Sequence, residues 1–195
     1  WANVLSTTRA YAEITANLGK SYEVLLNTYK PFACGIVIHP AIDACIQLRN
    51  AHQLTPGQID RVDLRVHPLV LELTGKKTPQ TGLESKFSVY FAAALAIVQG
   101  SAGMRDFSDQ NARNPMIAGV RDRVTATVDP SIMEDQVRAT ITLKDGRTFE
   151  TFVEHAVGSL ARPMSDSDLE AKFMGLVDGV LAAPRARALM DLCWT

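Results

Sequence analysis

Long apolar runs are absent from this sequence of 195 residues. The longest of them, Phe91 to Val98, is far shorter than the roughly 20 residues that a membrane-spanning helix needs. No stretch has the pattern of a signal peptide. The sequence therefore predicts a protein without a membrane partner.

An excess of charge of one sign is also absent. Lysine and arginine total 20, aspartate and glutamate total 21, and the net charge is −1. Nucleic acids and acidic membrane surfaces are bound through clustered basic side chains. Because the basic residues are scattered here, we expect no nucleic-acid partner.

Cysteine and histidine are scarce, and neither shows the spacing of a metal site. Cys34, Cys45 and Cys193 form an odd set without a CxxC motif, which is typical of reduced thiols. The four histidines have no short ligand spacing between them, so no metal site is expected. The thiols also favour a cytoplasmic location.

Four segments show the alternation of apolar and polar residues that is typical of half-buried strands. Asp145-Gly146 separates the last two and suits a tight hairpin turn, because both residues tolerate positive φ. The segments are Ile59–Val66, Val124–Val128, Val137–Leu143 and Arg147–Val153. We therefore predict an α+β fold with about four mostly antiparallel strands, covered by helices on one face and with helical segments at both ends.

Apolar periodicity, proline at a first helical position and N-terminal capping residues mark the helices. Helices are predicted at 40–50, 84–98, 115–121, 165–176 and 182–192, with another that ends near Gly19. The stretch 69–83, rich in glycine, proline and threonine, is predicted to be a loop.

The segment YKPFACGIVIHP contains the first candidate site. Lys30 and His39 flank a rigid apolar stem, which would hold two titratable groups in fixed positions. A solvated loop lysine and a histidine that only caps a helix are the plainer alternatives, and both remain open.

A second candidate lies at the start of the helix predicted at 84–98. Lys86 and Ser88 lie beside backbone N–H groups that have no partner within the helix, a position that favours a carboxylate or phosphate. A helix start that binds no ligand is the alternative.

The order of several motifs resembles that of the MmgE/PrpD family. The series is YKPFACGIVIHPAIDA, IDRVDLRVHP, LTGKKTPQTGLESKFSVYFAAALAIVQG, VDP, LKDGR and RPMSDSDLEAKF, and the resemblance extends from about Leu18 to the end. The family includes 2-methylcitrate dehydratase, cis-aconitate decarboxylase and an iminodisuccinate epimerase. Its members have a large all-helical domain and a smaller α+β domain, and this chain resembles the smaller one.

The resemblance implies a division into three parts. Residues 1–28 form a helical segment that belongs to or leads from the all-helical domain, 29–164 form the α+β domain, and 165–195 form C-terminal helices. Most of the all-helical domain is missing, so it is an expected partner, together with a small carboxylate substrate and a second copy in a homodimer. The chain alone is expected to be inactive.

The resemblance further implies a cofactor-independent lyase or isomerase, which dehydrates, decarboxylates or epimerises a small di- or tricarboxylate next to a carboxylate. Lys30 matches an active-site lysine and His39 a frequent histidine, so both are candidate catalytic residues. Lys86, Ser88 and Tyr90, in or beside the KFS element, are candidate substrate-binding residues. A lysine can pair with a substrate carboxylate or, if desolvated, act as an acid or base.

Two positions depart from the family pattern. Gly35 stands where the decarboxylase branch has a histidine, and Phe91 stands where many members have a tyrosine. Both departures favour dehydration or epimerisation over decarboxylation of cis-aconitate. Two alternatives remain open: a non-catalytic packing or dimerisation domain with residual anion binding, and a family member that has lost catalysis.

Overall fold

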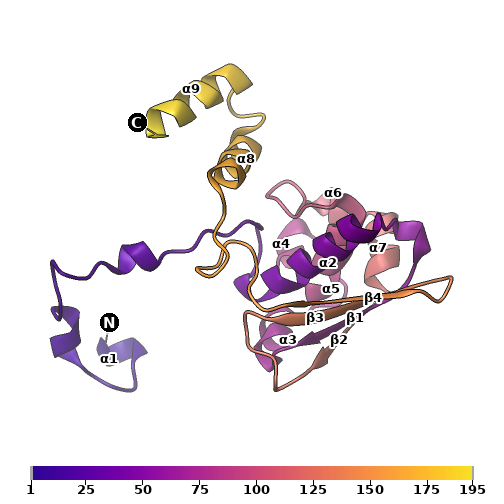
Figure 1. The fold of residues 1–195 in the computed structure, drawn as a ribbon, viewed down its shortest axis with the longest axis horizontal. Helices are drawn as coiled ribbons and strands as arrows, with labels where there is room; N and C mark the ends of the chain where they lie inside the picture. The colour runs from indigo at the N-terminus through magenta and orange to yellow at the C-terminus, as the bar shows by residue number, and fades with distance from the viewer. Residues whose placement is uncertain (1, 195) are drawn as a thin grey trace.

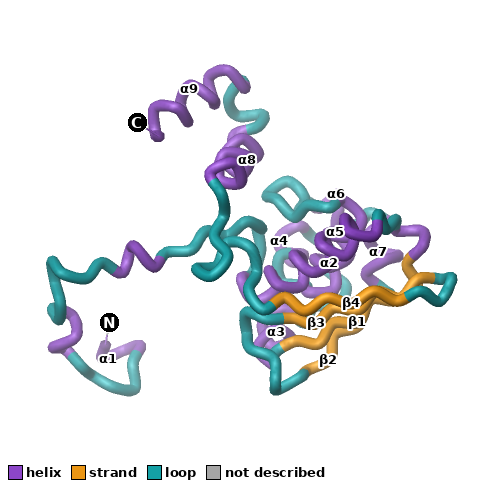
Figure 2. Tube along the Cα trace, viewed as in Figure 1, coloured by secondary structure: helices purple, strands orange, loops and turns teal. Residues whose placement is uncertain are grey.

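The computed structural model describes residues 2–194, and a four-stranded sheet forms one side of its main body (Figure 2). The strands are β1 (Ile59–Val66), β2 (Val124–Val128), β3 (Val137–Leu143) and β4 (Thr148–Val153). Their order is β2-β1-β3-β4, with β1 parallel to β2, β1 antiparallel to β3, and β3 antiparallel to β4. The predicted α+β class with mostly antiparallel strands is confirmed.

Helices cover the apolar face of this sheet (Figure 1). In β3, buried and half-buried residues alternate, so one face of the strand enters the core. Helix α2 (His39–His52) packs on β3 and β4, and helix α5 (Val89–Gln99) packs on β2 and on α2. Each large aliphatic side chain buried between these layers stabilises the fold by about 1.5–3 kcal/mol.

Most of the predicted helices are present. Helix α7 (Pro115–Arg121) has the predicted bounds, and helix α2 begins one residue before Pro40. Ser165 and Asp168 form the predicted capping box at the start of α8 (Asp166–Val177). The last helix, α9, is Ala183–Trp194.

The prediction of a loop at 69–83 was wrong for its first part, which forms helix α3 (Pro68–Thr74). Pro68 occupies the first helical position, and the His67 ring accepts a hydrogen bond from the Leu69 N–H (3.2 Å). This is an N-terminal cap followed by proline, which together start a helix.

The single helix predicted at 84–98 is in fact two, α4 (Gly82–Ser85) and α5. The break comprises Lys86, Phe87 and Ser88, because the Ser88 hydroxyl accepts the Phe91 N–H (3.1 Å) and so starts a new helix. The polar stretch that follows contains the short helix α6 (Asp109–Ala112).

The N-terminal segment extends away from the body (Figure 1). It contains α1 (Ala2–Leu5) and 3-10 turns at Tyr11–Ile14 and Glu23–Leu26, in place of the helix expected to end near Gly19. Two further 3-10 turns, Ile36–Ile38 and Pro56–Gln58, belong to the body. Trp1 and Thr195, at the outer ends of the segments predicted at 1–28 and 165–195, lie outside the described residues.

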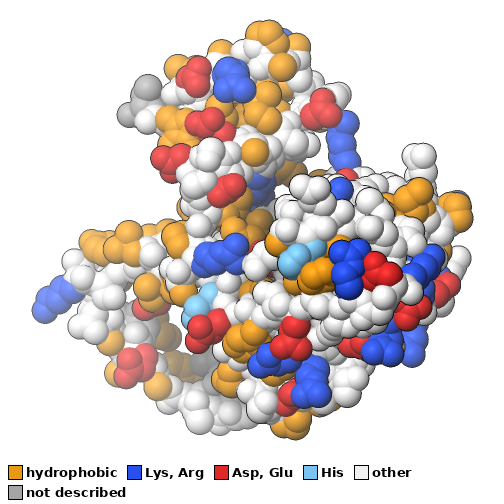
Figure 3. Space-filling model, turned by 45° about the vertical axis from the view of Figure 1, so that its right-hand side comes forward, with side chains coloured by type: hydrophobic (Ala, Val, Ile, Leu, Met, Phe, Trp, Pro, Cys, Tyr) orange, Lys and Arg blue, Asp and Glu red, His pale blue; other side chains and the backbone are white. Residues whose placement is uncertain are grey.

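Apolar side chains are exposed on the two terminal segments. Figure 3 shows them gathered over the N-terminal segment and over α8 and α9, whereas the body carries mixed basic and acidic side chains. They include Val4, Leu5, Ile14, Leu18, Leu25 and Leu26 at one end and Leu176, Val180, Leu192 and Trp194 at the other. Within residues 2–194, no helix combines the length and the apolar character that a membrane span requires.

Candidate functional site

The loop that carries Lys30 is fixed to the body by backbone hydrogen bonds. The Ala33 N–H donates to the Ala102 carbonyl (3.0 Å), and the Gly35 N–H donates to the Lys86 carbonyl (3.1 Å). The Lys30 ammonium then folds back and donates to the Cys34 carbonyl (3.2 Å). Lys30 is therefore held on a loop that lies next to the turn containing Lys86, which follows the short helix α4.

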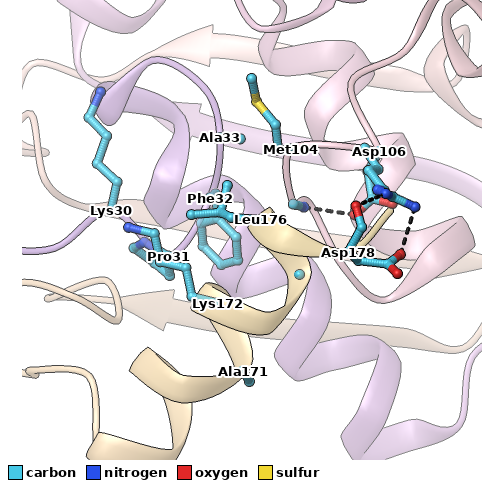
Figure 4. A pocket seen from close by; sticks show the side chains of 13 residues that line it. Lys30, Pro31, Phe32, Ala33, Met104, Asp106, Ala171, Lys172, Leu176 and Asp178 are labelled. Carbon is cyan, nitrogen blue, oxygen red and sulfur yellow. Dashed lines mark hydrogen bonds and ion pairs between the residues drawn. The ribbon is translucent and has the colours of Figure 1, made fainter. Parts of the chain in front are cut away.

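A cavity of about 390 Å³ opens beside this loop (Figure 4). Three parts of the chain line it: residues 30–33, residues 103–106 and helix α8. Its volume lies within the roughly 300–1,000 Å³ that small-molecule sites occupy. Segments far apart in the sequence thus build one candidate site.

The carboxylates of this cavity already have partners. Asp178 forms an ion pair with Arg105 (2.6 Å), and Asp106 accepts hydrogen bonds from the Ser101 hydroxyl (2.9 Å) and the Gly103 N–H (2.7 Å). Figure 4 shows dashed contacts to Asp178 and Asp106 on the side of the cavity away from Lys30. They do not neutralise the lysines that line the cavity.

Lys86 approaches the same region from the other side of the loop. Its ammonium lies 3.3 Å from the sulfur of Met104, which is one of the residues lining the cavity. Lys30 and Lys86 both lower the pKa of the Cys34 thiol, although burial outweighs them and raises that pKa to about 12. Two of the predicted site residues are therefore brought together around Cys34.

Among the residues that the structure describes, no carboxylate pairs with Lys30, Lys86 or Lys172. Lys172 is half-buried on α8 and lines the same cavity as Lys30. Lysines that gather without acidic partners create a field that attracts anions. Such a pocket suits a ligand that carries carboxylates.

His39 lies behind the loop, not in this cavity. The side chain is 3% exposed, the ring of Phe32 packs edge-on against it (5.3 Å between centroids), and Nε2 is buried without a hydrogen-bond partner. Burial, and next the charge of Lys30, lower the pKa of His39 to about 4. The imidazole is thus neutral near pH 7, and it also borders a separate cavity of about 190 Å³.

Ser88 and Tyr90 do not line the Lys30 cavity either. Ser88 is fully buried, and its hydroxyl caps α5. Tyr90 is also buried, which raises the pKa of its phenol, and the Lys77 ammonium lies 5.5 Å from the ring centroid. In the structure, Ser88 therefore caps a helix and Tyr90 packs in the core.

The two departures from the family pattern lie in different surroundings. Phe91 is fully buried and packs near Phe107 (6.2 Å between centroids), so this position faces the core. A Cβ atom added to Gly35 would lie 3.4 Å from Thr74 Cγ2 and 3.6 Å from the Lys86 carbonyl oxygen. Of the two, only position 35 places a side chain beside the lysines.

Sequence reasoning did not identify Lys172 or Arg105 as part of the site. Both depend on where α8 meets the loop at 103–106, a contact between segments that are about 70 residues apart, as the Arg105–Asp178 pair shows. The only local signal was the presence of Lys172 in the motif SDSDLEAKF, which carries no information on that contact.

Comparison with known proteins finds one matching family model and several relatives of about a quarter sequence identity. The model of the MmgE/PrpD C-terminal domain matches residues 32–195. Cis-aconitate decarboxylase of Mus musculus is 24% identical over 175 residues, which cover 84% of this chain and 35% of that protein. The Homo sapiens enzyme is 24% identical over 185 residues, covering 88% and 38%.

A second group of relatives has a different activity in its name. The 2-methylcitrate dehydratase of Salmonella typhimurium is 25% identical over 136 residues, which cover 63% of this chain and 28% of that protein. The chain therefore spans about a third of the length of the curated relatives that it matches.

Proposed function

This chain belongs to the MmgE/PrpD family, and from that premise we propose that the whole protein is a lyase or isomerase acting on a small di- or tricarboxylate. The observation that carries the proposal is that Lys30 and Lys172 line one cavity, with Lys86 beside its lining residue Met104, and that none of the three has an acidic partner among the described residues. In this proposal the α+β domain supplies the cationic side of the substrate pocket.

The chemistry of such substrates explains why lysines are needed. Loss of a proton next to a carboxylate leaves negative charge on the carboxylate oxygens, and fixed positive groups stabilise that charge as it develops. The Lys30 ammonium is already held by the Cys34 carbonyl, so little reorganisation accompanies substrate binding. Electrostatic stabilisation of this kind requires no cofactor.

We favour dehydration or epimerisation over decarboxylation. The names of the relatives include both a dehydratase and a decarboxylase, so they do not choose between the reactions. Of the two positions that depart from the family pattern, only Gly35 lies near the lysines, and it places no imidazole beside Lys86 where the decarboxylase branch has a histidine. His39 remains a candidate through its position directly behind the Lys30 loop, while Ser88 and Tyr90 remain candidates only through the resemblance.

The exposed apolar side chains favour a helical partner. Residues 3–30 bury no side chain, and α8 and α9 bury only Ala186 and Met190. Contiguous apolar patches on a protein surface mark interaction sites. We propose that they pack against the remaining part of the protein, which the relatives possess, and that the assembly is a homodimer located in the cytoplasm.

The same patches support a second candidate function, a packing or dimerisation domain with residual anion binding. The two functions differ in turnover. The test is the steady-state kinetics of the full-length protein with 2-methylcitrate and with cis-aconitate, comparing the parent, Lys30→Ala and the control Lys144→Ala.

We expect turnover with at least one substrate and a loss of at least about a hundredfold in kcat/KM for Lys30→Ala, since a charge that acts in the transition state contributes roughly 2.7–4 kcal/mol. Lys144 is exposed in the β3–β4 turn, so its replacement leaves the kinetics unchanged. Undiminished turnover in Lys30→Ala would remove that residue from the mechanism. Absence of turnover together with a stable dimer favours the packing domain.

A further inference from the structure

Helix α8 contributes a side chain to the cavity that the sequence does not assign to any site. The helix is started by the Ser165–Asp168 capping box, and Lys172 lies in its second turn. Lys172 lines the cavity together with Lys30, although the two are about 140 residues apart in the chain. Figure 4 shows the two lysines on different elements, Lys30 on the loop and Lys172 on the helix, with the Lys30 ammonium directed away from Lys172 towards its hydrogen bond with the Cys34 carbonyl.

A second observation connects both lysines to one buried side chain. Both ammonium groups lower the pKa of the His39 imidazole, which means that each lies within electrostatic reach of it. Within residues 2–194, neither lysine forms an ion pair, and the cavity's Asp178 and Asp106 are held by Arg105, Ser101 and Gly103. Asp43 and Asp168 line a neighbouring cavity together with Lys172, but Asp43 pairs with Arg162 and Asp168 accepts hydrogen bonds from Ser165.

The far end of α8 is also tied to the cavity. Arg105 pairs with the Asp178 carboxylate and donates a further hydrogen bond to the Asp178 carbonyl. This contact joins the residue that ends α8 to the loop at 103–106, which forms the opposite wall. The C-terminal end of the helix that carries Lys172 is therefore attached to the loop at 103–106.

We propose that Lys172, supplied by α8 to the cavity that Lys30 also lines, is a carboxylate-binding residue of this pocket, so that the site takes ligands with at least two carboxylates. The inference rests on the proposed function, since it assigns a binding role within the same site. It also assigns α8, which lies outside the sheet and its covering helices, to the substrate pocket.

The test is equilibrium binding of tricarballylate, a tricarboxylate that cannot be dehydrated, to the full-length protein by isothermal titration calorimetry. The variants are Lys172→Met, which keeps the length of the side chain without its charge, Lys172→Arg, which keeps the charge, and Lys30→Ala. Lys144→Ala is the matched control for loss of one lysine.

We expect Lys172→Met to raise the Kd about tenfold, because a hydrogen bond to a charged group contributes roughly that factor. Lys172→Arg should stay within about threefold of the parent, and Lys144→Ala should match it. Each variant's melting temperature is measured in parallel, and an unchanged value excludes misfolding as the cause.

Three results are decisive. Weaker binding by Lys172→Met with retention by Lys172→Arg supports the inference. A Kd unchanged in Lys172→Met but raised in Lys30→Ala overturns it and leaves the proposed function standing. Failure of the parent protein to bind tricarballylate overturns both.

Discussion

Replacement of Asp43 tests how the C-terminal part of the chain is attached to the body. Asp43 lies in α2, with its side chain 6% exposed. It accepts hydrogen bonds from the Val157 N–H (3.1 Å) and from the Gln47 amide (3.0 Å), and pairs with Arg162 (2.5 Å). One carboxylate thus fixes the loop that leads from β4 to α8.

The free-energy cost of each substitution follows from the groups that it leaves without a hydrogen-bond partner. Asp43→Ala removes a charged acceptor and leaves the Val157 N–H without a partner, and each loss costs about 1–3 kcal/mol. Arg162 is 47% exposed, so water hydrates its freed guanidinium. We expect a net cost of about 3 kcal/mol, which is roughly a hundredfold in the opening equilibrium of the loop.

Arg162→Ala is the informative comparison. It removes the ion pair but leaves Asp43 hydrogen-bonded to Val157 and Gln47, so the loop should open less than tenfold more often. Asp145→Ala removes an exposed pair with Arg147 and serves as the control, because exposed ion pairs contribute little.

Hydrogen exchange of the Val157 amide, followed by mass spectrometry in the full-length protein, measures this opening directly. Exchange roughly a hundred times faster in Asp43→Ala, with a smaller effect in Arg162→Ala, is the expected order. If Arg162→Ala exchanged faster than Asp43→Ala, the ion pair and not the buried carboxylate would hold the loop, and the reasoning would be refuted.

Two further predictions concern stability. Gly158→Ala should lower the melting temperature, because Gly158 has φ of 90° and an added Cβ would collide with the Tyr29 carbonyl oxygen. Gly57→Ala is the control: nothing lies within 4 Å of the added Cβ, so the melting temperature should stay unchanged. His39 is neutral when folded, with a pKa of about 4 against 6.5 when unfolded, so its stabilising contribution is complete above pH 6.5 and is lost as pH falls towards 4. His39→Gln should therefore lose less melting temperature between pH 7.5 and 5 than the parent; equal losses would contradict this.

Elements that depend on close neighbours in the chain were predictable. The turn at Gly146 requires positive φ, which the residue has (88°), and the start of α7 requires only Asn114 and Pro115. In each case the partner atoms lie within a few residues. Local rules are sufficient there because no distant contact competes with them.

Elements with two competing local signals were not predictable. His67-Pro68 carries the same helix-start signal as His39-Pro40, but the glycine and lysines that follow favoured a loop. Apolar periodicity continued through Phe87 and hid the cap at Ser88. Periodicity reports which face is buried, and a cap reports where a helix begins, so the second must be read independently of the first.

The candidate site could be predicted only in the part that one motif contains. Lys30 and His39 are nine residues apart, yet Lys30 is exposed and lines the cavity, whereas His39 is buried against Phe32 and does not line it. Lys172 could not be assigned, because its approach to Lys30 depends on how α8 meets the body.

In the terminal segments, the energy of burial decides whether a predicted helix forms. Isolated helices shorter than about 12–15 residues are marginal in water, and their stability in proteins comes from packing an apolar face. Residues 1–28 have apolar side chains in a helical pattern, but Val4, Ile14 and Leu25 find no surface within the described chain. Only the four-residue helix α1 and short 3-10 turns form there, in place of the longer helix that was expected to end near Gly19. A sequence pattern specifies a face that can be buried, and only a surface that buries it turns that pattern into a helix.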